Sequence, residues 1–483
     1  MSDLPGYSEA MRLANDALSP RAQRIRRYEA YVNGQQYDGR KGYWDTSVPT
    51  EERAPCIVYL ILAEAIESNV DLVMGDGRFP TVTSKPEGDG EEDPDAEEGD
   101  LSEDESAGLD KFMGKLAKAA RFEPVTSEAF ASAQAQSSTC GVFGVRDGKP
   151  FCDLVSAWWC EPTLAPDDSV SKLVIQYPYL AEYQDQAGRW RVRPMLYRRE
   201  IDAVSDTTMQ AVELTQTVNA ATAKWKPESR IEHGWGFCPV IWYPFMRGAK
   251  MAGTIDGHAI GEHMLDEVER LDQVLSQRHA SALMAGDPQW TECGVDPGFN
   301  PSAGGRTAVI PATREGGVGT TANPVVGGYP AAGGSGTAMH KSSGARKKGG
   351  QYPWQYTDKD TVVKLHTLPG EALKALDDDA RDLRLKICEG LAVVFLDPEY
   401  VKGSGALSGK ALSLLKQRQK NRCSRYRDDL GARWIVPGIS MLLRICHVVA
   451  KRGEKLRVRG FRKIAPMLAK FEEIDTNAAM VSS

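Results

Sequence analysis

The stretch that decides the fold is Ile260-Gly-Glu-His-Met-Leu-Asp-Glu-Val-Glu-Arg-Leu-Asp-Gln-Val-Leu275. Its apolar residues recur at intervals of three and four, the period of an amphipathic helix, and predict a helix over 255–285. Such a helix would be on the order of 45 Å long. Gly286-Asp287-Pro288 ends it, because these residues favour a turn.

A second long helix is predicted over 368–396 and ends at Asp397-Pro398. Its apolar stripe consists of Leu373, Leu376, Ala380, Leu383, Ile387, Leu391 and Val394. Between the two helices, 286–367 is rich in glycine and has short strand patterns at 306–310 and 361–366. A helix out, a small domain and a helix back do not fit easily inside one globule, so we expect copies of the chain to complete the core.

A third helix is predicted over 409–436, after a Gly/Ser loop at 397–408. It is strongly basic and has no aliphatic residue between Leu415 and Leu430, which makes that part poorly suited to a globular core. Its charges indicate either a solvated face or contact with phosphates or with a neighbouring subunit's acidic surface. Pro437-Gly438 is expected to break the helix, and an apolar helix follows.

Upstream of these helices the sequence changes from a helical to a β pattern. Helices are predicted over 7–33, 56–74 and 107–135, the last with a break at Pro124. Residues 139–245 read as antiparallel strands, with a hairpin turn at Asp147-Gly148. Six of the ten tryptophans lie in this part, as expected where a small sheet must close its own core.

Composition places the chain among soluble proteins of more than one domain. It has 483 residues, of which 41% are hydrophobic and 26% charged, and no apolar run approaches the roughly 18 residues of a membrane span. We expect no signal peptide, and the nine scattered cysteines fit a reduced compartment. The net charge is −7, yet residues 85–105 alone carry −11. We interpret 84–107 as a solvated acidic loop, or less simply as a docking strip for a basic partner.

No motif predicts an enzyme. Ser404-Gly-Ala-Leu-Ser-Gly-Lys-Ala411 approaches a P-loop, but it lacks the first glycine and the final Ser or Thr that holds Mg²⁺. The seven histidines show no metal-ligand spacing, and Asp377-Asp378-Asp379 point in different directions on a helix. We therefore expect no catalytic residue, cofactor or metal.

The order of these segments resembles that of the portal proteins of tailed bacteriophages, the rings through which DNA enters and leaves a capsid. Gly236-Phe-Cys-Pro-Val-Ile-Trp-Tyr-Pro244 followed by Ile260–Arg270 is similar to the family's entry into its first stem helix. Ser408-Gly409-Lys410-Ala411-Leu412 fits the Ser-Gly-x-Ala-Leu pattern of the tunnel loop. The resemblance covers about 10–450. It departs at the acidic insertion and at the glycine-rich clip.

The resemblance implies an α+β, portal-type fold: mainly helical, with a β-rich wing, two stem helices, a small α/β clip and a short helical crown. It divides the chain into a wing at 1–254, stem helices at 255–285 and 368–396, a clip at 286–367, a tunnel loop at 397–408, a long basic helix at 409–436 and a crown and tail at 437–483.

The implied function is a ring, by resemblance a homododecamer, at one capsid vertex of a virion assembled in the host cytoplasm. It would conduct double-stranded DNA in packaging and ejection, and would bind the terminase large subunit, the major capsid protein and a head–tail connector, with no membrane. The residues expected near DNA are Lys402, Ser404, Gly405, Lys410 and Lys416, and those expected at the motor or connector are Arg306, Arg346, Lys347 and Lys348. The alternatives are a nucleic-acid-binding module that uses the basic segments 410–433 and 451–463, or a P-loop-like NTPase on 404–411.

Overall fold

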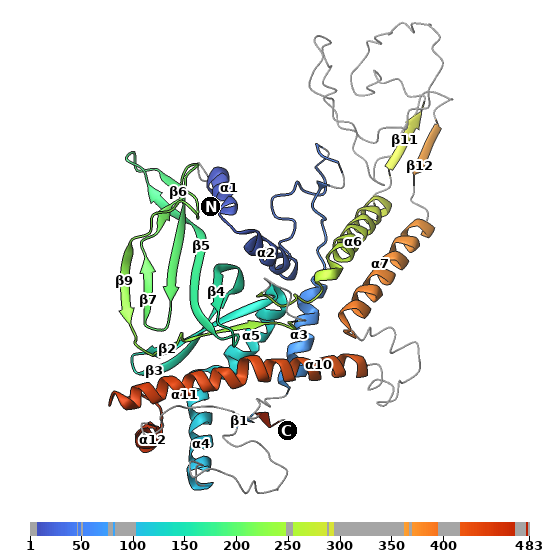
Figure 1. Ribbon diagram of the computed structural model, residues 1–483. Helices are drawn as coiled ribbons and strands as arrows, with labels where there is room; N and C mark the ends of the chain where they lie inside the picture. The colour runs from blue at the N-terminus through green and yellow to red at the C-terminus, as the bar shows by residue number, and fades with distance from the viewer. Residues whose placement is uncertain are drawn as a thin grey trace. The chain divides into compact units, whose positions relative to one another are not determined.

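The computed structural model describes residues 7–45, 47–49, 52–75, 81–82, 103–247, 255–286, 289–293, 362–366, 370–394, 416–468 and 480–481 (Figure 1). Helices and antiparallel sheets both contribute to it, which confirms the α+β class. The chain forms two compact units. One comprises Met1–Gln277 with Leu376–Ser483, and the other comprises Arg278–Ala375.

The N-terminal helix predicted over 7–33 is two helices, α1 (Tyr7–Asp16) and α2 (Pro20–Asn33). Proline disfavours helical backbone in the residue before it, and Ser19 accordingly has an extended ψ of 155°. The Ser19 hydroxyl accepts a hydrogen bond from the backbone N–H of Ala22 and so caps the start of α2. Ser19 and Pro20 therefore both interrupt the predicted helix and begin the second one. The helix α3 (Ile61–Met74) begins five residues later than the predicted 56–74.

Two helices replace the predicted 107–135 helix: α4 (Glu103–Ala119) and α5 (Phe122–Gln136). The break falls at Arg121, whose φ of 55° is left-handed, and not at Pro124. Pro124 lies in the first turn of α5, where its missing N–H costs no hydrogen bond.

The β-rich part holds two antiparallel sheets. The first has the order β10-β2-β3 and consists of β2 (Ser138–Arg146), β3 (Lys149–Ser156) and β10 (Val240–Pro244). Its β2–β3 turn has φ of 53° at Asp147 and 73° at Gly148, the two positive values of a type I′ turn, so the predicted hairpin is confirmed.

The second sheet has the path β4-β5-β6-β7-β9, with β8 also paired to β6. Its strands are β4 (Cys160–Leu164), β5 (Val170–Gln184), β6 (Trp190–Ile201), β7 (Ser205–Met209), β8 (Val212–Glu213) and β9 (Pro227–Glu232). A short 3-10 turn, η2 (Ala157–Trp159), leads from β3 into this sheet. The helix α1 packs on its β5–β6 hairpin.

The C-terminal helix runs without a break through α10 (Gln417–Leu430), the π-helical turn η4 (Gly431–Ile435) and α11 (Val436–Lys451). The predicted break at Pro437-Gly438 is therefore wrong. Pro437 offers no N–H to the preceding turn, and the wider π turn just before it accommodates the ring, so the helix continues.

Trp434, in that π turn, lies at the centre of the largest core. Its ring stacks on Phe122 at 6.3 Å, and its Nε1 donates to Thr126 Oγ1 at 3.1 Å. Among the described residues, the helix 417–451 is long and apolar enough in one window to cross a membrane, but 56% of that window is buried inside the protein. Length and composition therefore fit the central helix of a core equally well.

The two long helices are α6 (Leu265–Gly286), after a 3-10 turn η3 (Glu262–Met264), and α7 (Gly370–Leu391). The predicted start of the first at 255 is wrong by ten residues, because Gly261 has a φ of 71° and ends the extended segment before it. The second unit contains the strands β11 (Gln289–Cys293) and β12 (Val362–His366), which pair antiparallel. The strand expected at 306–310 lies outside the described residues.

The remaining elements are the helix α12 (Phe461–Leu468) and the paired two-residue strands β1 (Thr81–Val82) and β13 (Met480–Val481). The acidic segment 84–107 falls largely outside the described residues, apart from the start of α4.

Candidate functional site

The structure places one of the nine residues proposed from the sequence for DNA or motor contact. Lys416 immediately precedes α10 and is half-exposed. The other eight lie outside the described residues: Lys402, Ser404, Gly405, Lys410, Arg306, Arg346, Lys347 and Lys348. The described elements that flank these positions in the sequence are the helix α10 and the long helices α6 and α7.

The helix α10 has one buried and one basic face. Its buried residues are Gln419, Cys423, Tyr426 and Leu430, and its exposed face includes Arg418, Lys420 and Arg425. The expectation that this helix is poorly suited to a core is wrong, because an aromatic ring, a thiol and a hydrogen-bonded amide fill the places where aliphatic side chains were missing. The exposed bases still present a positive face to any anionic neighbour.

Two arginines of α10 turn inward instead and bind the ends of other helices. Arg422 Nη1 donates to Leu391 O at 2.8 Å, in the last turn of α7. Arg427 donates to Val73 O and Leu72 O, each at 3.2 Å, in the last turn of α3. The last carbonyls of a helix have no partner within it, and the C-terminus carries partial negative charge, so a guanidinium stabilises both. These two bases are structural and are not available to phosphates.

A fully buried carboxylate, Asp272, fastens two loops to α6. Its Oδ1 accepts the backbone N–H of Tyr59 at 2.8 Å, and its Oδ2 accepts the Tyr37 hydroxyl at 2.9 Å and Gln36 Nε2 at 3.1 Å. Burial raises the pKa of Asp272 to about 6, because water no longer solvates the charged form, and the three hydrogen bonds only partly offset this. One turn further on, Ser276 Oγ accepts the N–H of Ile57 at 3.0 Å.

Side chains of α2 anchor the chain that leads into α6. Arg21 makes a bidentate ion pair with the buried carboxylate of Asp256, at 2.6 and 2.7 Å, and Arg24 adds a contact at 3.1 Å. Tyr28 donates to Glu262, and Arg40 pairs with Glu269 at 2.7 Å. The base of α6 is thus fixed by charge as well as by apolar packing.

In the first unit, residues 265–277 of α6 and 376–391 of α7 share one apolar core, which includes Val268, Leu271, Leu383 and Ile387. Across their outer side, Lys386 pairs with Glu267 at 2.9 Å and Arg270 with Asp379 at 3.4 Å. Leu385 remains 50% exposed on α7. A single exposed leucine is common on protein surfaces and does not by itself indicate an interface.

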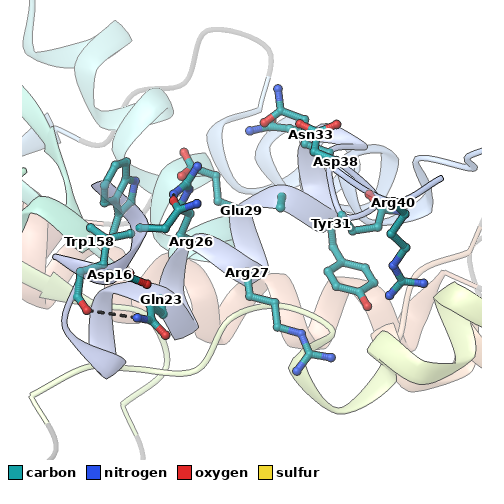
Figure 2. Close-up of a pocket in the computed structure, with 15 residues that line it drawn as sticks. Asp16, Gln23, Arg26, Arg27, Glu29, Tyr31, Asn33, Asp38, Arg40 and Trp158 are labelled. Atoms are coloured by element: carbon teal, nitrogen blue, oxygen red, sulfur yellow. Dashed lines mark hydrogen bonds between the residues drawn. The ribbon is translucent and has the colours of Figure 1, made fainter. Parts of the chain in front are cut away.

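A groove of about 890 Å³ lies along α2 (Figure 2). Arg26, Arg27 and Arg40 line it together with the acids Asp16, Glu29 and Asp38, so the two signs of charge balance. Arg26 lies over the ring of Trp158 at 5.7 Å, and the pKa of Arg27 is raised chiefly by its hydrogen bond with Tyr31. None of its lining residues is a serine, cysteine or histidine.

The rest of the described chain offers little to chemistry. It contains no group of three or more His, Cys, Asp or Glu side chains that could hold a metal ion. Burial raises the pKa of the Cys423 thiol to about 11 and those of Cys238 and Cys446 to about 12, which keeps them protonated and unreactive. The prediction that most cysteines are buried apolar groups is confirmed: of the described ones, six are buried, Cys388 is half-buried and Cys56 is exposed.

Sequence reasoning missed Asp272 and the capping arginines. Asp272 directly follows Leu271 on the buried side of α6, so an acid inside an apolar stripe was the available signal. The sequence holds no comparable signal for Arg422 and Arg427. Eight lysines and arginines share the predicted helix, and only the fold decides which of them point inward.

Comparison with known proteins adds no relative. No protein-family model matches the chain, and no curated protein matches it.

Proposed function

We propose that this protein is a phage-type portal subunit, which forms a ring that conducts double-stranded DNA and has no ATPase activity of its own. One observation carries the proposal. The helices α6 and α7 have 22 residues each, each begins in one compact unit and ends in the other, and their parts within the first unit, 265–277 and 376–391, share an apolar core. Such a pair fits an arm whose remaining surface is covered by neighbouring copies around a ring.

The base of the arm supports the same proposal. The buried carboxylates Asp272 and Asp256 and the guanidinium of Arg422 fix the first-unit parts of α6 and α7 within that unit, so each subunit would begin its arm from the same setting. A ring requires this, because every subunit must offer the same geometry to the next. Contact with the terminase motor or the connector remains part of the proposal through Arg306, Arg346, Lys347 and Lys348, and contact with the major capsid protein remains part of it without an assigned residue.

The mass of the purified protein tests the proposal. We expect a ring of about ten to fourteen copies, the range that the family resemblance implies. Deleting 403–407 should leave the ring intact and reduce the DNA that is packaged or retained. A monomer at every concentration would refute the ring, and unchanged packaging by the deletion variant would refute the tunnel-loop assignment. Nucleotide turnover abolished by Lys410→Ala would favour the NTPase alternative.

A further inference from the structure

Ten exposed bases that the proposed channel does not use gather around α4 and α12. We call them the α4–α12 basic surface. Its members are Lys111, Lys115, Lys118, Arg121, Lys149, Lys455, Arg457, Arg459, Arg462 and Lys463. They come from four segments: the outer face and end of α4, the β2–β3 turn, the chain after α11, and α12.

The four segments are held side by side by specific contacts. Phe112 of α4 packs on Phe461 of α12 with ring centroids 6.3 Å apart, and Figure 1 shows the two helices below the long C-terminal helix. The backbone N–H of Arg457 donates to Gly148 O at 2.7 Å, which fixes the tail to the hairpin turn. Lys115 Nζ is 3.7 Å from the place a Cβ on Gly460 would take. The bases therefore form one surface.

On α4 the bases follow a helical stripe. Lys111, Lys115 and Lys118 are spaced four and three residues apart, so they share one exposed side of the helix, next to the buried side that carries Phe112 and Leu116. Successive amines are thus on the order of 5 Å apart along the helix axis. A row of this kind matches a partner with closely and regularly spaced negative charge.

A hollow of about 540 Å³ lies at the edge of this surface. Arg121, Lys149 and Arg457 line it, with Arg146 beside them. The acids that line it are Glu128, Asp147 and Asp153, and Arg146 already pairs with Asp153 at 3.1 Å. Within the described part of the chain, Arg146 is thus the base of this hollow that pairs with a carboxylate, and it is not one of the ten.

We propose that the α4–α12 basic surface binds the phosphate backbone of double-stranded DNA, outside the proposed channel and without regard to base sequence. Clustered cations repel one another, and a polyanion that releases its counterions relieves this repulsion. Of the aromatic residues beside these bases, Phe112 and Phe461 are buried and the Phe151 ring is covered by Arg146 at 4.5 Å, so stacking on single-stranded bases is not favoured.

The test uses a covalently closed DNA minicircle, which has no end to thread through a channel, and the full-length protein. Binding is measured over a range of KCl concentrations for the wild type and for Lys111→Gln/Lys115→Gln/Lys118→Gln. Arg189→Gln/Lys224→Gln/Lys226→Gln, at exposed bases of the other sheet, removes the same charge and serves as control. Arg457→Gln/Arg459→Gln changes a second segment of the surface.

For three lost phosphate contacts, the slope of log affinity against log salt should become shallower by roughly 2.7, whereas the control should retain the wild-type slope. For Arg457→Gln/Arg459→Gln, which removes two phosphate contacts, the slope should become shallower by roughly 1.8. Slopes equal to wild type in both surface variants would overturn the proposal. Poly-glutamate that binds as tightly as the minicircle would also overturn it, and would point to an acidic protein instead. Particle mass is recorded on the same samples, so failure of the ring is seen separately from failure of this surface.

Discussion

Replacing Asp272 with asparagine should make the stability of this protein less dependent on pH. Burial raises the pKa of this carboxyl from 3.8 to about 6. The folded state therefore holds the proton more tightly than the unfolded chain does, and wild-type stability falls as pH rises from about 4 through 6. A shift of about two pH units corresponds to about 3 kcal/mol of unfolding free energy lost above pH 6. Of this, about 1.5 kcal/mol is lost between pH 5 and pH 8.

The asparagine variant keeps the shape of the site but has no proton to lose. Its oxygen can still accept the N–H of Tyr59, and its amide can donate to Gln36 Oε1, which has no hydrogen-bond partner in the wild type. We expect the unfolding free energy of Asp272→Asn, relative to wild type, to rise by about 1.5 kcal/mol from pH 5 to pH 8. Urea unfolding at fixed protein concentration measures it at each pH.

The matched control is Asp266→Asn, at an exposed carboxylate on the same helix. Its difference from wild type should not change with pH by a comparable amount. If the difference between Asp272→Asn and wild type is also flat from pH 5 to pH 8, the carboxylate does not carry the raised pKa, and the argument from its burial is refuted.

Two further substitutions test the packing around the C-terminal helix, each by urea unfolding. Arg427→Gln should lower the free energy of unfolding by about 1–3 kcal/mol, because the last carbonyls of α3 lose a charged donor. Arg425→Gln, on the exposed face, should change it little. Equal losses in the two variants would contradict the capping role of Arg427. Gly438→Ala should destabilise by about 1–3 kcal/mol, since the new Cβ would lie 2.3 Å from Phe122 Cζ. Gly114→Ala in α4, where a Cβ meets no neighbour, should instead stabilise by about 0.5–1 kcal/mol, and a gain at both positions would contradict the packing argument.

Much of the secondary structure could be predicted from periodicity and turn chemistry. The stripe of α7 is buried at Ala380, Leu383, Ile387 and Leu391, because a three–four spacing fixes which side of a helix is apolar wherever it packs. The Asp147-Gly148 turn was predictable because few residue pairs accept two positive φ values.

The errors arise where a local rule meets tertiary packing. Pro437 ends helices in general, but the π turn around Trp434 lets this one continue. Pro124 was read as a break, although the chain turns at Arg121, whose left-handed backbone no composition rule indicates. The candidate site depends still more on the fold, because a sequence shows how many arginines α10 has and not which helix end each one reaches.

The inward arginines of α10 have a mechanical consequence. One rigid helix holds the C-terminal end of α7 through Arg422 and that of α3 through Arg427, one and a half turns further along. A twist or pull applied to α7 must therefore move α10 with it or break the guanidinium contacts at Leu391. Because α10 continues into the π turn that holds Trp434, a displacement of the end of α7 would reach the tryptophan-centred core through the same helix.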